Sequence, residues 1–278
     1  MKRHSKKSSK KKRKKQLNLI FGIFFLLAGL LLFFQNCHKN TSFSYKKNNG
    51  SNNFLEAKIK ISIVMDDLGQ SLEPLNWFLE NKYPITLSFL PNLPYTKILS
   101  EKLYQKGYEI IIHIPMEPND FPKVNPGSDA IFLSMDKSKI KEKIMEFKKE
   151  LPFAIGANNH MGSKFTSDLN KMICFMEVLK ENNLFFLDSR TTAETKGFEA
   201  AKATGVLYLE RDVFLDNVLE LAYVKRQFEA LIKKAKVKGY GIGICHPHKE
   251  TFKILKEILP YYNKKVNFSY LKDLTAKN

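Results

Sequence analysis

The chain has 278 residues, a formal net charge of +18 and a hydrophobic content of 44%. This content excludes a largely disordered chain, and the length suits one α/β domain of barrel size once an unusual N-terminal part is set aside. Ten of the basic residues lie within residues 2–15, which contain no acid, so the rest of the chain carries a net charge of only +8 (18 minus 10).

The N-terminal part predicts a membrane anchor. Residues 1–16 are basic, and residues 17–34 are apolar apart from Asn18 and carry no charge. As a helix this stretch spans about 27 Å, close to the thickness of the hydrocarbon core of a bilayer. A basic block before such a span marks the cytoplasmic side, which predicts a cytoplasmic tail, a single-pass anchor in the cell membrane and a periplasmic or extracellular domain. A cleaved signal peptide is the alternative, although no small-residue cleavage motif follows the span.

The segment after this span is rich in Asn, Ser and Lys, which predicts a polar linker over residues 35–57 and a folded domain over residues 58–278. The basic tail directly adjoins the apolar span, so we do not expect a nucleic-acid partner. Three cysteines give neither a disulfide framework nor a CxxC metal motif, and a bridge between Cys174 and Cys245 stays open as an alternative.

From Lys58 onward, short β-rich runs alternate with amphipathic helical stretches. The expected strands lie at residues 60–65, 85–89, 109–114, 153–157, 184–188, 206–210, 240–245 and 266–271. The expected helices lie at residues 71–81, 95–106, 136–150, 168–181, 217–236 and 249–260. This alternation predicts parallel βαβ units, and the nearly all-apolar runs are typical of buried parallel strands. Periodicity alone leaves a closed barrel and an open sheet as alternatives.

Polar side chains follow six of the expected strands. They are Asp66, Asp67, His113, Glu117, Asn158, Asn159, His160, Asp188, Arg211, Asp212 and His246. Because the carboxyl ends of parallel strands meet at one edge of a sheet or barrel, we expect these side chains to lie together.

Several of these residues also have a purely structural interpretation. The two aspartates before Gly69 are as typical of a turn or helix cap as of catalysis, and a lone histidine in an apolar strand is more often a hydrogen-bonded core residue than a ligand. Asp188 is equally typical of a cap for the segment after it, and Asp212 and Asp216 of caps for the helix expected near residue 217.

Six segments together resemble the divergent polysaccharide deacetylase family. In chain order they are IVMDDLG, IHIPMEP, GANNHMGSKFT, FFLDSRTT, ERDVFLDN and GICHPHKET. The resemblance covers about residues 58–275 and implies a distorted (β/α) barrel of about seven parallel strands that uses a divalent metal. It implies that Asp66 is a catalytic base, that Asp67 binds metal, that His113 lies on the strand of the metal-binding histidines and that His246 is a general acid.

The sequence departs from the related, typical polysaccharide deacetylases in its second motif. There, two histidines stand four residues apart, whereas here His113 is followed by Glu117, and no arginine-proline motif is visible. His160 is our candidate for the remaining imidazole ligand.

These features predict a membrane-anchored, metal-dependent hydrolase that deacetylates an envelope polysaccharide or related glycan. We expect Asp67, His113 and His160 to hold Zn²⁺, and Asp188 or Asp212 to orient His246. The residues expected to contact substrate are Glu117, Asn158, Asn159 and Arg211. The alternative is an inactive envelope protein that keeps the fold and binds a glycan or serves a structural role, and a bound metal with acetate release would distinguish the two.

Overall fold

The structure, a computed structural model, describes residues 59–275. The predicted basic tail, membrane span and linker lie outside these residues. Among the residues described, no helix combines the length and the apolar character that a membrane crossing requires.

The described residues form nine strands that alternate with helices. The strands are β1 (Lys60–Leu68), β2 (Ile85–Phe89), β3 (Ile110–Met116), β4 (Gly156–Met161), β5 (Phe185–Asp188), β6 (Tyr208–Glu210), β7 (Val213–Phe214), β8 (Tyr240–Cys245) and β9 (Asn267–Phe268). They belong to one sheet in the order β6-β5-β4-β3-β2-β1-β8-β7, with β9 beside β1. Every pair is parallel, as the alternation in the sequence predicts.

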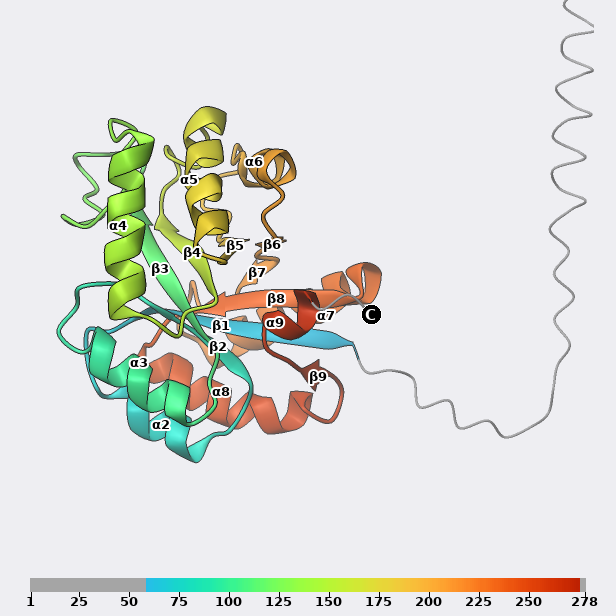
Figure 1. The fold of residues 1–278 in the computed structure, drawn as a ribbon. Helices are drawn as coiled ribbons and strands as arrows, with labels where there is room; N and C mark the ends of the chain where they lie inside the picture. The colour runs from blue at the N-terminus through green and yellow to red at the C-terminus, as the bar shows by residue number, and fades with distance from the viewer. Residues whose placement is uncertain (1–58, 276–278) are drawn as a thin grey trace, which may run out of the picture. The chain divides into compact units, whose positions relative to one another are not determined.

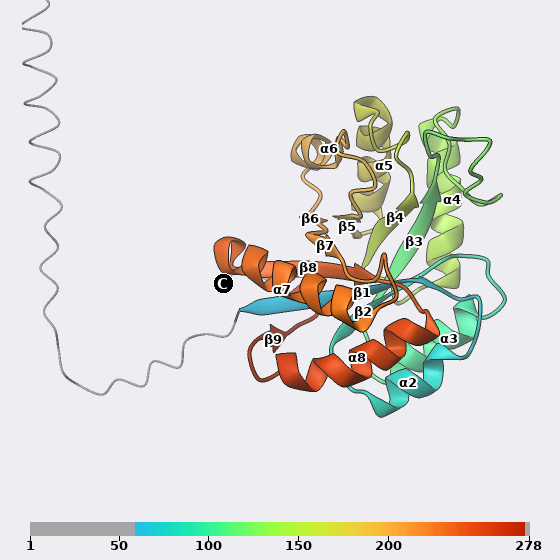
Figure 2. The same ribbon diagram turned by 180° about the vertical axis from the view of Figure 1, so that it is seen from behind.

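Helices connect most successive strands, β6 and β7 excepted, and cover the sheet. They are α2 (Pro74–Glu80), α3 (Thr96–Gln105), α4 (Lys137–Glu150), α5 (Leu169–Glu181), α6 (Gly197–Thr204), α7 (Leu221–Lys238), α8 (Lys249–Tyr262) and the short α9 (Lys272–Thr275). Figures 1 and 2 show α2, α3 and α8 grouped together, with α4, α5 and α6 in a second group. Helices α4 and α5 begin where the side chains of Asp136 and Asp168 accept hydrogen bonds from backbone N–H groups of the first turn.

The sheet curves towards a barrel. Its two edge strands, β6 and β7, follow each other along the chain with only Arg211 and Asp212 between them. Two edges this close along the chain require the sheet to bend round on itself. The fold is therefore a parallel α/β fold consistent with a (β/α) barrel, and within residues 59–275 no ladder joins β6 to β7.

Two apolar clusters fill the two faces of this curved sheet. The larger cluster joins strands to the surrounding helices, for example through Phe78, Phe147 and Phe228. The smaller cluster consists of strand residues such as Val64 and Ile244, together with Leu271, and it lies inside the curve. With both faces covered, β2 and β3 are buried along their whole length. Their polar residues, Thr86, Ser88 and His113, are hydrogen-bonded.

The structure corrects several expected boundaries. Strand β4 begins three residues later than expected and continues through the polar residues Asn158–His160, because these pair with β3. The expected strand at 266–271 is reduced to β9, while β7, α6 and α9 were not expected. Helix α7 begins at Leu221 after Glu220, so neither Asp212 nor Asp216 caps it. Cys174 and Cys245 are free, which removes the alternative of a bridge between them.

Candidate active site

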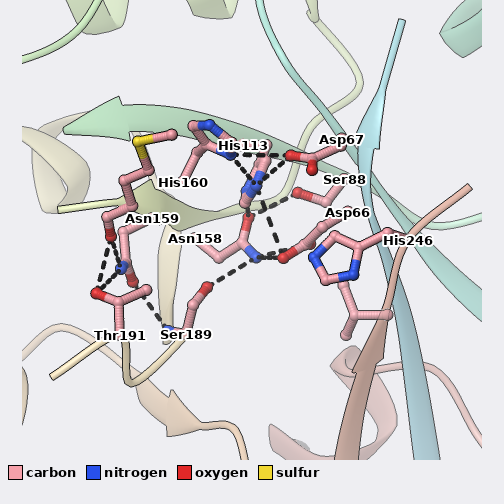
Figure 3. Close-up of polar contacts among 12 residues, drawn as sticks. Asp66, Asp67, Ser88, His113, Asn158, Asn159, His160, Ser189, Thr191 and His246 are labelled. Carbon is pink, nitrogen blue, oxygen red and sulfur yellow. Dashed lines mark hydrogen bonds and ion pairs between the residues drawn. The ribbon is translucent and has the colours of Figure 1, made fainter. Parts of the chain in front are cut away.

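The ends of four strands bring the main polar residues together. Asp66 and Asp67 lie at the end of β1, His113 lies in β3, His160 lies in β4, and His246 directly follows β8 (Figure 3). Strand β1 pairs with β8 up to Met65 and Cys245, which places Asp66 beside the start of the His246 segment. The expectation that these strand ends meet at one edge is confirmed for these residues.

Adjacent residues on a regular strand point to opposite faces, so the two aspartates need a local irregularity to serve one site. The register of β1 against β2 shifts between Met65 and Leu68, and Asp67 adopts a left-handed φ of 56°. A non-glycine residue with positive φ is uncommon and marks a constrained backbone. The turn that brings both carboxylates to the site therefore lies at Asp67 itself.

Three side-chain atoms converge beside this turn. Asp67 Oδ1 lies 3.1 Å from His113 Nε2 and 2.9 Å from His160 Nδ1. The two ring nitrogens are themselves 3.2 Å apart. One carboxylate oxygen and two imidazole nitrogens form a ligand set typical of zinc and similar divalent ions.

The surroundings of Asp67 Oδ1 fit a bound cation. This oxygen is buried and accepts no hydrogen bond of acceptable geometry within the described residues, although two ring nitrogens lie close to it. A buried charged oxygen that accepts no well-formed hydrogen bond is costly, and a metal ion at the meeting point of the three atoms would bind this oxygen directly. The residues present therefore fit a divalent metal.

Asn158 fixes the orientation of His113. The Asn158 amide nitrogen donates to Asp66 Oδ1 at 2.8 Å, which leaves the amide oxygen facing His113 Nδ1, also at 2.8 Å. Because that oxygen can only accept, His113 Nδ1 must carry the hydrogen. In neutral His113 the lone pair is then on Nε2, the atom that faces Asp67.

Burial and charge separate the acid-base properties of the two aspartates. Burial raises the pKa of Asp66, and the nearby His113 and His246 only partly oppose this. For Asp67, contacts with His113 and His160 outweigh burial and lower the pKa. Burial lowers the pKa of His113, but the charges of Asp66 and Asp67 overcome it and raise that pKa to about 9. Asp67 is therefore suited to remain ionised, and Asp66 to accept a proton.

His246 pairs with a carboxylate that differs from the expected ones. Its Nδ1 lies 3.0 Å from Asp216 Oδ1, and its backbone N–H donates to Asp216 Oδ2 at 2.7 Å. Thr251 also donates to Asp216 Oδ2, at 2.8 Å. Although burial opposes it, contact with Asp216 raises the pKa of His246. Figure 3 shows the His246 ring beside Asp66.

The prediction that Asp188 or Asp212 contacts His246 is wrong. Asp188 is fully buried and accepts hydrogen bonds from Thr195 and Tyr208, and so holds the chain that follows β5. Asp212 accepts from the backbone of Ile242 at 2.9 Å and joins β7 to β8. Asp216 was considered only as a helix cap, because the two-residue strand β7 before it gave no recognisable strand signal.

Two of the residues expected to contact substrate make hydrogen bonds that hold the end of β4 in place. The amide oxygen of Asn159 accepts from the backbone of Ser189 at 2.9 Å, and its nitrogen donates to the carbonyl of Met161 at 2.7 Å. Asn158 belongs to the hydrogen-bond network around Asp66, which also includes Ser189 and Ser88, of which Ser88 could not be recognised from the sequence. Ser88 donates to the Asn158 oxygen at 2.6 Å, and Asn158 donates to Ser189 at 3.2 Å.

Glu117 and Arg211 are likewise engaged with the protein. The Glu117 carboxylate accepts from the backbone of Leu133 at 2.7 Å and from Lys164 Nζ at 2.6 Å, and so joins two loops beside the site. The Arg211 guanidinium donates to the carbonyl oxygen of Ser189 at 2.7 Å and stacks over the Phe214 ring at 3.7 Å. These contacts indicate that both residues position the loops at the rim of the site.

The chain is similar to bacterial proteins over most of its folded part. It is 36% identical over 203 residues to an uncharacterized protein of Haemophilus influenzae, a match that covers 73% of this chain and 72% of the relative. It is also 36% identical over 200 residues to the uncharacterized protein YibQ of Escherichia coli K12, which covers 72% of this chain and 62% of the relative.

Two solved structures share the fold. An uncharacterized protein from Agrobacterium tumefaciens C58 superposes with a TM-score of 0.72 at 21% identity, covering 78% of this chain and 89% of that one. A proposed cellobiose-phosphate cleavage protein from Enterococcus faecalis V583 gives a TM-score of 0.56 at 12% identity, covering 79% of this chain and 100% of that one. The sequence profile described as divergent polysaccharide deacetylase matches residues 63–275. The chain therefore belongs to the divergent polysaccharide deacetylase family.

Proposed function

We propose that this protein is a metal-dependent hydrolase that removes acetyl groups from an N-acetylated or otherwise acylated envelope glycan. One observation carries the proposal: Asp67, His113 and His160 direct three ligand atoms to one point, next to the buried Asp66 and the His246–Asp216 pair. Family membership supports the class of reaction.

The three convergent side chains would hold the ion, with Zn²⁺ as the proposed metal. A divalent ion bound there would lower the pKa of water and polarise the carbonyl of the acetyl group. The network through Asn158 holds His113 in the tautomer that presents Nε2 to the ion.

Asp66 is the proposed general base. It does not belong to the convergent ligand set, but its Oδ2 lies 3.7 Å from His113 Nε2, within reach of the same small space. Burial raises its pKa above the ordinary value, which makes this carboxylate a stronger base. Asp66 would take the proton from the attacking water.

His246 is the proposed general acid. Asp216 holds its Nδ1, which leaves Nε2 to donate a proton to the leaving amine or alcohol. The raised pKa of His246 favours the protonated form that such a donor needs.

The location of the reaction is proposed from the sequence. Residues 17–34 would anchor the chain in the cell membrane as a single span, with residues 58–278 outside the cytoplasm, where an envelope glycan is accessible.

The test is acetate release by the purified full-length protein from an N-acetylated glucosamine oligosaccharide. Chelation should abolish release, added Zn²⁺ should restore it, and His113→Ala and His160→Ala should each lower metal content sharply, since two ligands hold zinc poorly. A metal-loaded protein that releases no acetate from a panel of acylated glycans would favour the inactive, glycan-binding alternative. Full metal content in both variants would refute the proposed ligands.

A further inference from the structure

His248 lies beside the site, and the proposed reaction does not use it. Its backbone N–H donates to the carbonyl oxygen of His246 at 2.8 Å, which closes a three-residue turn centred on Pro247. The fixed φ of proline suits a turn of this kind. The turn places the imidazole rings of His246 and His248 with their centroids 6.1 Å apart.

Asp216 completes a second cluster with these histidines. One potential ligand atom from each of Asp216, His246 and His248 lies within 4.8 Å of the others. Asp216 Oδ1 and His246 Nδ1 are already 3.0 Å apart, and ligand atoms around a tetrahedral zinc ion lie about 3.3 Å from one another. His248 is exposed and its side chain makes no capping hydrogen bond to α8, so no such bond has to break for a side-chain rotation to close the remaining distance.

We propose that Asp216, His246 and His248 form a second site for a divalent ion such as Zn²⁺ or Co²⁺, and that its occupation inhibits the enzyme. One carboxylate and two imidazoles suit these ions. The binding of the ion stands on the cluster alone, whereas the inhibition rests on the proposed function, in which His246 donates a proton.

Inhibition follows from the chemistry of imidazole. A histidine binds a metal only in its neutral form, so an ion on either ring nitrogen of His246 prevents the imidazolium from forming. An ion on Nδ1 would also take the place of the hydrogen bond to Asp216 Oδ1. The group that should protonate the leaving amine is then lost, and such proton transfer typically contributes about 10²–10⁴-fold to the rate.

The second site should bind its ion more weakly than the first. In the first cluster, His113 is buried and all three ligand atoms lie within 2.9–3.2 Å of one another. In the second, the exposed His248 must become ordered and the His246–Asp216 hydrogen bond must break. Rising metal concentration should therefore activate the enzyme first and then inhibit it.

The test uses metal-free full-length protein and Zn²⁺ in equilibrium dialysis, beside His248→Ala and His160→Ala. His248→Ala should bind one ion fewer than wild type and lose the weaker binding step. His160→Ala should lose the tighter step and keep the weaker one. Cys37 and His38 are present in all three proteins, so any ion held there cancels in the comparison.

The second readout compares the rate of acetate release at two Zn²⁺ concentrations: one that fills only the tighter site, and an excess that fills both sites. For wild type, the rate in excess Zn²⁺ should be at least about tenfold lower than the rate at the first concentration. For His248→Ala, the two rates should be nearly equal. Equal ion counts for wild type and His248→Ala would refute the second site. Loss of the ion with unchanged inhibition would refute its effect on His246. If no acetylated glycan is a substrate, the proposed function fails, while the ion counts still decide whether the site exists.

Discussion

At the scale of single residues, the buried carboxylate of Asp216 fixes the orientation of the partly exposed His246. Both its oxygens are used: Oδ1 by the His246 ring, and Oδ2 by the His246 backbone and Thr251. The side chain of His246 is thereby fixed relative to its own backbone. Asp216 therefore acts as a positioning residue for the proposed general acid.

We expect Asp216→Asn to lower kcat by about 10²–10⁴-fold, because an amide neither orients His246 in the same way nor stabilises its protonated form. The metal content of the proposed site at Asp67, His113 and His160 should not change. Asp212→Asn is the matched control, since Asp212 contacts Ile242 and not His246. Steady-state kinetics and metal analysis check both variants, and equal kcat values for the two would contradict this role.

The site residues that follow long strands could be predicted from the sequence, whereas a contact that depends on the path of a short strand could not. Asp66, Asp67, His113, His160 and His246 all follow or lie in strands with strong apolar signals, and the structure brings them together. The partner of His246 was misplaced because β7 has only two residues. No local pattern could show that Asn158, from β4, bonds to Asp66, 92 residues earlier.

At the scale of elements, the loop after β1 depends on a glycine that packs against α3. Gly69 has a φ of 121°, and a Cβ atom there would lie 2.2 Å from Thr96 Oγ1. Thr96 in turn donates a hydrogen bond to the carbonyl oxygen of Leu90. This packing fixes the segment immediately after the two aspartates.

Gly69→Ala should therefore lower the free energy of unfolding by more than Gly107→Ala does, by about 1–3 kcal/mol. Gly107 also has positive φ, at 90°, but a Cβ atom there meets nothing within 4 Å. The comparison thus separates steric overlap from backbone strain. Urea denaturation of both variants checks the difference, and equal losses would show that Thr96 moves aside without cost.

Glu109, just before β3, connects the sheet to the C-terminal segment. It is buried and accepts from Thr86 at 2.8 Å and from the backbone N–H groups of Leu271 and Lys272 at 3.0 and 3.1 Å. Burial nevertheless raises its pKa above the ordinary value of 4.5. Its protonation therefore adds stability below pH 4.5, and this contribution is lost as pH rises through the folded-state pKa.

Because glutamine stays uncharged, the stability of Glu109→Gln relative to wild type should rise with pH above 4.5 and then level off. Urea denaturation across a pH series measures this difference. A relative stability that falls with rising pH would show instead that the three donors favour the ionised carboxylate.

Most long elements were predicted within a few residues, because their periodicity is strong. Strands β2 and β8 coincide with the expected ranges, and α4 and α5 begin one residue after the expected positions. The strand expected at 153–157 was misplaced, because most of this apolar run precedes β4 and the strand itself continues through Asn158, Asn159 and His160. Polar residues at the end of a strand have the sequence pattern of a loop when their side chains belong to a buried hydrogen-bond network.

At the scale of the whole molecule, the orientation across the membrane stays a prediction. Cysteine introduced by Ser51→Cys, with Cys37 and Cys174 replaced by serine, should react with a membrane-impermeant label from outside the inner membrane. Cys245 is buried and should not contribute to the signal. Labelling that requires lysis of the inner membrane would contradict the extracytoplasmic location.

The central claim is that two adjacent carboxylates perform different tasks in one hydrolytic site. It is tested most directly by metal content and acetate release of Asp66→Asn and Asp67→Asn beside wild type. Asp67→Asn should lose metal and activity together, because it removes the charged ligand oxygen near both histidines. Asp66→Asn should keep the metal and lose turnover, because an amide cannot accept the proton. Full turnover in Asp66→Asn, or identical behaviour of the two variants, would contradict this division of roles.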